Sequence, residues 1–206
     1  MVVDKKLDAI REKMFKKHKS LNVGSYYRWL DTLLKSDLYD IFFSMPKPSV
    51  HHAHLTACAT MPFLVELTYY DSVFYSEKEN KFFCSAKGCD QEGFIKVNTL
   101  RQYSKDSVEF DKQLIAKMEL RPSEEQLEDH LIWQFFEPKF IMTNDLFYYE
   151  PFFEKVLYRA CKNFIKEMVT VVELKHIFGW VFDDDHKPIS LREEIEIFVR
   201  TQRIIQ

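Results

Sequence analysis

The chain has 206 residues and a net charge of −3, and 46% of its residues are hydrophobic and 16% aromatic. This length and composition support one large or two small domains with a sizeable core, and they argue against intrinsic disorder. The near-neutral charge without a basic face argues against nucleic-acid binding, and no apolar run approaches the ~20 residues of a membrane span. We therefore expect neither nucleic acid nor a membrane among the partners.

The first 44 residues predict a helical region. Residues 4–19 have the composition of an exposed, charged helix, and they lack the apolar stretch of a secretory signal, so the compartment stays open. A second helix is predicted over 26–43, where apolar residues recur at helical spacing. Pro46 and Pro48 would end it, because proline removes a backbone donor and disfavours helix in the residue before it.

Three of the seven histidines lie in the stretch SVHHAHL, residues 49–55, which predicts a short strand. Side chains alternate along a strand, so His52 and His54 would leave the same face while His51 and Ala53 point the other way. Two imidazoles on one face are suited to a shared metal ion. The alternative is that they are polar surface residues at a solvated strand end.

A helix over 59–70 is expected to follow, and then a small β-rich insertion at about 71–105 with short strands and turns. The insertion contains Cys84 and Cys89, which are spaced more widely than a usual zinc-knuckle pair. A disulfide or two free thiols is the favoured interpretation.

Three further helices are predicted from start signals and periodicity. The first spans 106–118, and the second follows Pro122 over 123–136 with Ser123 as its N-cap. The third begins near Pro151 and carries an apolar stripe at 3–4 spacing, with Cys161 in the core. The stripe consists of Phe153, Val156, Leu157, Ala160, Cys161, Phe164 and Met168.

The apolar run VTVVEL, residues 169–174, predicts a strand buried on both faces, as in a parallel sheet. Glu173 near its end would need a polar partner. A last helix over 190–205 has acids at its start and arginines at its end, which suits the helix dipole. We expect His176 and His186 to be surface residues.

The sequence MPK followed by HHAHL resembles the first-strand motif of the adenosine deaminases. The longer match is to the adenosine deaminase-related growth factors, a largely secreted branch of that family. Further matching stretches occur in order at 108–120 and 131–175, together with the Tyr- and Cys-bearing insertion. The resemblance covers roughly residues 22–200, and its parts share order and spacing.

The resemblance implies an α/β fold: the N-terminal portion of a (β/α)8 metal-dependent hydrolase barrel, mostly helical, with about two barrel strands. Residues 1–44 would form the N-terminal helical region and residues 45–206 the incomplete barrel. The first barrel strand would be 49–55 and the second 169–174, with the insertion at about 71–105 between them. A complete barrel takes ~250 residues, so six strands are expected to be missing.

By the same resemblance, His52 and His54 would be the first two ligands of a Zn²⁺ ion, and Glu173 would face the substrate nucleoside. The alternative for Glu173 is a salt-bridged structural residue. Family members carry an aspartate directly after the histidine pair or one residue later. Here those positions hold Leu55 and Thr56, of which Thr56 could donate a hydrogen bond to the ribose but supplies no charge.

The implied reaction is the zinc-dependent hydrolytic deamination of adenosine to inosine. The family's third zinc histidine, its aspartate ligand and its general-acid glutamate have no counterpart in this sequence, so no catalytic residue is identified and the chain is expected to be a truncated form. An inactive form is one open alternative. Another is a non-catalytic binding protein derived from the family, with a homodimer as one state, and a third is an unrelated α+β domain with an accidental motif.

Overall fold

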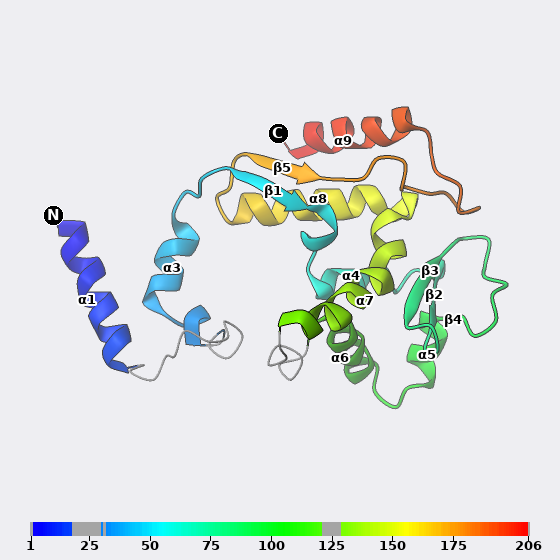
Figure 1. The fold of residues 1–206 in the computed structure, drawn as a ribbon, viewed down its shortest axis with the longest axis horizontal. Helices are drawn as coiled ribbons and strands as arrows, with labels where there is room; N and C mark the ends of the chain where they lie inside the picture. The colour runs from blue at the N-terminus through cyan, green and yellow to red at the C-terminus, as the bar shows by residue number, and fades with distance from the viewer. Residues whose placement is uncertain (1, 18–29, 31, 121–128, 206) are drawn as a thin grey trace.

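Helices make up most of the chain in this computed structural model, which describes residues 2–17, 30, 32–120 and 129–205 (Figure 1). The described helices are α1 (Val2–Lys17), α3 (Asp37–Ser44), η1 (Leu55–Ala57, a 3-10 turn), α4 (Met61–Leu67), α5 (Val97–Tyr103), α6 (Ser107–Met118), α7 (Asp129–Tyr148), α8 (Glu150–Lys166) and α9 (Leu191–Ile205). The strands are β1 (Val50–His54), β2 (Val73–Ser76), β3 (Lys81–Cys84), β4 (Ile95–Lys96) and β5 (Val172–Lys175). The expected mixed α/β composition is confirmed, and the described residues form no closed barrel.

The two predicted barrel strands lie side by side. β1 and β5 form a two-stranded parallel sheet although more than a hundred residues separate them in sequence. Figure 1 shows α8 and α9 running alongside this pair, and α8 packs against α9. Parallel neighbours joined through a helix are the basic unit of barrel and doubly wound folds. The arrangement is therefore compatible with part of a barrel.

The expectation that the second strand is buried on both faces is wrong. β5 alternates between half-buried Val172 and Leu174 and exposed Glu173 and Lys175, and Val171 just before it is 52% exposed. A parallel strand is apolar on both faces only where both faces are covered. Here Leu174 packs against the core, while nothing described covers the face that carries Glu173.

The insertion folds as expected into a small β unit. β2 pairs antiparallel with both neighbours, giving the strand order β3-β2-β4, and β3 lies against α7. All four residues of β2 are buried. The main core joins this unit to α4, α6, α7 and α8, and its fully buried members include Leu64, Leu67, Val73, Phe82, Met142, Leu146, Phe153 and Leu157.

The long helices follow their sequence signals with one exception. In α8, Pro151 occupies the first turn and the predicted stripe is buried from Phe153 to Ala160, which confirms that part of the prediction. Cys161 and Phe164 are half-buried, and Met168 lies beyond the end of the helix and is 47% exposed. Asp106 caps α6 by accepting hydrogen bonds from two backbone N–H groups. α7 continues through Pro138 to Tyr148, well past the stretch that we expected to be helical, because packing against β3 and α8 compensates for the missing donor. The predicted N-cap Ser123 lies outside the described residues.

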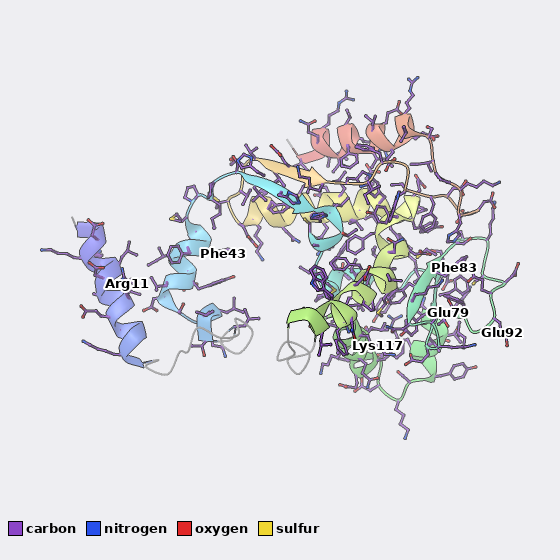
Figure 2. All side chains as sticks on the ribbon, in the orientation of Figure 1. Arg11, Phe43, Glu79, Phe83, Glu92 and Lys117 are labelled. Carbon is purple, nitrogen blue, oxygen red and sulfur yellow. The ribbon has the colours of Figure 1, made fainter. Side chains whose placement is uncertain are left out.

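The N-terminal region forms separate helices. Of the helix predicted over 26–43, the structure describes residues 30 and 32–43, and the expectation of one helix is wrong there: a turn and a bend at Lys35 and Ser36 interrupt it. α3 begins only at Asp37, where the Ser36 hydroxyl accepts from the Tyr39 N–H at 3.2 Å. Figure 2 shows Arg11 on α1 and Phe43 on α3 at the end of the molecule opposite the insertion, which carries Phe83. No helix in the described ranges combines the length and apolarity required to cross a bilayer.

Candidate functional site

The predicted histidine pair converges at the carboxyl end of β1. The Nε2 atoms of His52 and His54 lie 3.0 Å apart, and their ring centroids are 5.0 Å apart. Both side chains are exposed, because alternation along the strand directs them away from the half-buried Ala53. Two nitrogens that bind one tetrahedral zinc at ~2.0–2.1 Å must lie about 3.3 Å apart. The observed separation fits two ligands of such a centre.

A register irregularity in β1 changes the expected place of His51. Val50 pairs with Val172 and Ala53 with Leu174, so three steps along β1 match two steps along β5. Such a bulge places two residues opposite one and re-aims a side chain. Strict alternation predicts that His51 points to the same side as Ala53. Because of the bulge it does not: His51 is exposed, and its Nδ1 lies 3.5 Å from Glu173.

Glu173 has the polar partners that its position requires. Its carboxylate contacts His51 at one oxygen and the Lys175 Nζ at 3.6 Å at the other. The hydrogen bond with His51, and then the charge of Lys175, lower the pKa of Glu173 below its ordinary value. The group is therefore ionised at neutral pH and available as a hydrogen-bond acceptor on the same sheet as the histidine pair.

Thr56, in the turn that follows β1, lines a hollow of about 570 Å³. The walls are mostly apolar and come from the start of α4, the end of α6 and the middle of α7, with Met61, Met118, Phe136 and Phe140 among them. A hollow of this size with few polar groups is typical of small-molecule sites. Thr56, two residues after His54, is thus one of the residues that line this pocket.

Histidine or carboxylate ligands beyond the pair are not gathered at this site. Within the described ranges, no group of three or more histidine, cysteine, aspartate or glutamate side chains is arranged to hold a metal. A catalytic zinc uses three protein ligands and one open position. The described residues therefore fit two ligands of a zinc centre and do not complete it.

The expectation that His176 is a surface residue is wrong. Its side chain is 2% exposed, and its Nε2 lies 2.5 Å from the Oε1 of Glu194, which is fully buried. The sequence contains a signal for this that we did not use. Glu194, Ile197 and Thr201 recur at i, i+3 and i+7 on α9, so the glutamate lies in the buried seam of the helix and needs a buried partner.

His186 is exposed as expected, but it has a structural environment of its own. Its ring stacks between Phe83 and Phe182, with centroid distances of 4.3 and 4.5 Å. This stack connects the insertion with the loop that follows β5. His186 is thus committed to packing in a different part of the molecule from the histidine pair.

The cysteines are free thiols, which was one of the two favoured interpretations for Cys84 and Cys89. Cys58 lies close to the histidine pair, and its S–H donates to the His54 carbonyl at 3.1 Å. Burial, and next the neighbouring Cys161, raise the pKa of Cys58 to about 11. A thiol held in this protonated form is a poor metal ligand, because the thiolate is the form that binds.

Comparison with known proteins gives distant matches. No family model matches the chain. Adenosine deaminase 2-A of Danio rerio is 22% identical over 162 residues, covering 73% of this chain and 32% of the relative. Adenosine deaminase of Phlebotomus duboscqi is 21% identical over 212 residues, covering 96% of this chain and 40% of the relative. The chain is a distant relative of adenosine deaminases. It spans about a third of the length of one relative and two-fifths of the other.

Proposed function

We propose that this chain provides two zinc ligands, His52 and His54, and part of the nucleoside site of an adenosine deaminase of the growth-factor type. The observation that carries the proposal is the convergence of the two Nε2 atoms to 3.0 Å at the end of a parallel strand. The carboxyl ends of parallel strands are where barrel enzymes place their chemistry. The distant relation to adenosine deaminases supplies the reaction class, hydrolysis of adenosine to inosine.

The chain's own residues would hold and orient the reactants. A zinc ion at such a site acts as a Lewis acid and makes a water molecule available as a nucleophile near neutral pH. Glu173, kept ionised by His51 and Lys175, would accept hydrogen bonds from the nucleoside. Thr56 would donate one, and the apolar hollow beside it would exclude water from the purine. The proposal requires further zinc ligands from outside the described residues.

Zinc binding by the 206-residue chain tests the proposal. Two histidines with water in the remaining positions should bind zinc weakly, and we expect the zinc bound at equilibrium dialysis to fall to background when His52 and His54 are both replaced by Asn. His186→Asn is the matched control, because it removes an exposed imidazole in a different part of the structure, and it should leave zinc retention unchanged. Equal zinc retention by the wild type and the double variant would remove the basis of the proposal. Ammonia release from adenosine, measured in parallel, shows whether this chain alone turns over.

A second candidate function, a binding protein derived from the same family, is favoured by the apolar surface of α9. Leu191 and Ile195 are 55% and 50% exposed on this helix, and Trp180 in the preceding loop is 51% exposed. Contiguous exposed apolar side chains mark contact surfaces. Light scattering across a concentration series should show association that Leu191→Lys with Ile195→Lys abolishes. A wild-type chain that stays monomeric at all concentrations would exclude self-association through this face.

A further inference from the structure

A buried carboxyl group anchors the segment that follows β5. Glu194 lies in the first turn of α9 with no exposed surface. One oxygen lies 2.5 Å from the His176 Nε2, and the other accepts the Gly179 N–H at 2.8 Å. Both carboxyl oxygens are therefore used to hold residues 176–179 against the helix. Gly179 adopts a φ of +84°, which only glycine adopts readily, so the backbone there is shaped to present its N–H to Glu194.

The anchored segment begins at His176, next to the residue that pairs with His54 in the sheet. His176 directly follows Lys175, and Lys175 is the register partner of His54 in the parallel ladder. The His54–Lys175 pair is the last pair of the β1–β5 ladder, and it directly precedes the anchored residues 176–179. Any movement of residues 176–179 would pass first to Lys175 and then to His54, because covalent and ladder connections are the shortest path between them.

Stabilisation of the fold does not by itself explain why the buried His176–Glu194 pair is polar. The His176 ring is enclosed by the aromatic rings of Tyr148, Phe153, Phe178 and Phe198, with centroid distances of 5.0–6.0 Å, and its Nδ1 has no hydrogen-bond partner among the described residues. Replacing buried polar pairs with apolar side chains is often neutral or stabilising. An apolar contact could fill the same space, but it could not bind the Gly179 N–H and the imidazole in fixed directions.

We propose that Glu194 and His176 are positioning residues that fix the carboxyl end of β5 and, through the ladder, the orientation of His52 and His54. This inference rests on the proposed function, in which those two histidines bind zinc. Groups that hydrogen-bond directly to a metal ligand commonly change metal affinity by 10–100-fold when they are removed. Glu194 and His176 act one step further away, through the backbone of β5, so we expect the lower end of that range. Glu194 touches neither substrate nor metal in this role.

The test compares Glu194→Ala, Glu194→Gln and Thr201→Val in the full 206-residue chain. Thr201 is the matched control, because it is buried on the same face of α9 and its hydroxyl has no described partner. By calorimetric titration we expect Glu194→Ala to raise the zinc dissociation constant about tenfold. Glu194→Gln should have a smaller effect, since its amide oxygen still accepts the Gly179 N–H, and Thr201→Val should have none. Amide hydrogen exchange should accelerate over Val50–His54 in the Ala variant only.

Two results would overturn the inference. If the Glu194 variants melt at lower temperature but keep wild-type zinc affinity and wild-type exchange in β1, the pair is only structural. Should Glu194→Ala fail to fold, the zinc dissociation constant of Glu194→Gln decides: a value above that of Thr201→Val supports the inference, and a wild-type value overturns it. If the wild type binds no zinc, the proposed function fails on its own, and exchange over Val50–His54 then decides the positioning role. Unchanged exchange in that case excludes it.

Discussion

Arg101 is a single side chain that connects three helices. Its Nε donates to Asp111 at 2.9 Å, and its two terminal nitrogens donate to Asn98 at 2.7 Å and to Thr68 at 2.8 Å. The guanidinium also lies 3.7 Å from the ring centroid of Tyr69, close enough for a cation–π contact. The charge is 7% exposed, and its fixed planar geometry matches this set of acceptors.

Removing this guanidinium should destabilise the protein strongly. We expect Arg101→Met to lower the free energy of unfolding by about 3 kcal/mol, because it leaves Asp111 largely buried without its cation. Arg200→Met is the comparison, since the Arg200–Glu154 pair is bidentate but largely exposed, and it should cost less than about 1 kcal/mol. Urea unfolding measures both. Equal costs would show that depth of burial does not separate the two pairs.

Asp145 makes the free energy of unfolding depend on pH. Burial raises its pKa above the ordinary 3.8, and the nearby His186 and the Cys84 N–H lower it in part. The folded protein then binds more protons than the unfolded chain at pH values between 3.8 and the raised pKa, so the unfolding free energy contributed by this group falls as pH rises through that window.

Asp145→Asn should remove this pH-dependent penalty. The amide oxygen can still accept from Cys84, so we expect the variant to gain stability over the wild type as pH rises from 4 to 7. Asp183→Asn is the control of opposite sign. Backbone hydrogen bonds lower the pKa of Asp183, so this group stabilises the folded protein above its ordinary pKa and the stabilisation is lost as pH falls. We therefore expect Asp183→Asn to lose stability relative to the wild type as pH rises. Urea unfolding at several pH values measures both slopes. Parallel slopes for the wild type and Asp145→Asn would contradict the assignment.

At the scale of elements, the connection from α8 to β5 is a tight helix cap. The Met168 N–H donates to Ile165 and the Val169 N–H donates to Phe164, which is the hydrogen-bond pattern of a Schellman motif. Met168 takes the left-handed position with a φ of 62°, and its carbonyl accepts the Lys47 N–H just before β1. This cap therefore sets where both barrel-like strands begin.

Glycine suits that position better than methionine. We expect Met168→Gly to raise the free energy of unfolding by about 0.5–1 kcal/mol, because a left-handed conformation is strained for a residue with a Cβ. The methionine is 47% exposed, so little apolar burial is lost. Glu167→Gly, at a neighbouring φ of −86°, should be destabilising instead. A loss of thermal stability in Met168→Gly would contradict the strain argument.

At the scale of the whole molecule, the insertion is attached to the segment after β5 by contacts between distant parts of the sequence. His186 stacks between Phe83 and Phe182, and the Ala86 N–H donates to the Asp184 carboxylate at 2.6 Å. Ser85 donates to the Asp184 carbonyl at 2.9 Å. Figure 1 shows the insertion and the strand pair on different sides of the helical core, so these loops are a second connection between them.

The stacked ring should contribute measurably to this connection. We expect His186→Ala to lower the unfolding free energy by about 1 kcal/mol relative to His186→Phe, which keeps an aromatic ring between the two phenylalanines. Both variants carry a Cβ at the same left-handed φ of 55°, so the backbone cost is matched. Thermal unfolding monitored by circular dichroism gives the difference. Equal stability of the two variants would show that stacking does not hold the insertion.

Some features were predictable from local pattern. The α8 stripe, the shared face of His52 and His54 and the β-rich insertion all depend on spacing within a few residues, where the 3.6 and 2.0 periods act directly. His51 and His176 were predicted incorrectly. The bulge that moves His51 depends on pairing with β5, and the burial of His176 depends on α9, so neither is contained in its own neighbourhood in the sequence.

By itself the sequence determined where most of the helices and strands form and which face of α8 is apolar, because these choices follow from backbone periodicity and the chemistry of neighbouring residues. It did not determine that one face of β5 is exposed. Only the tertiary structure decided that Lys175 lies beside His54, that Glu173 pairs with His51 and that Glu194 holds residues 176–179. Those contacts join residues up to 122 positions apart. They depend on how whole elements pack, a result of total buried area and register that no local pattern specifies.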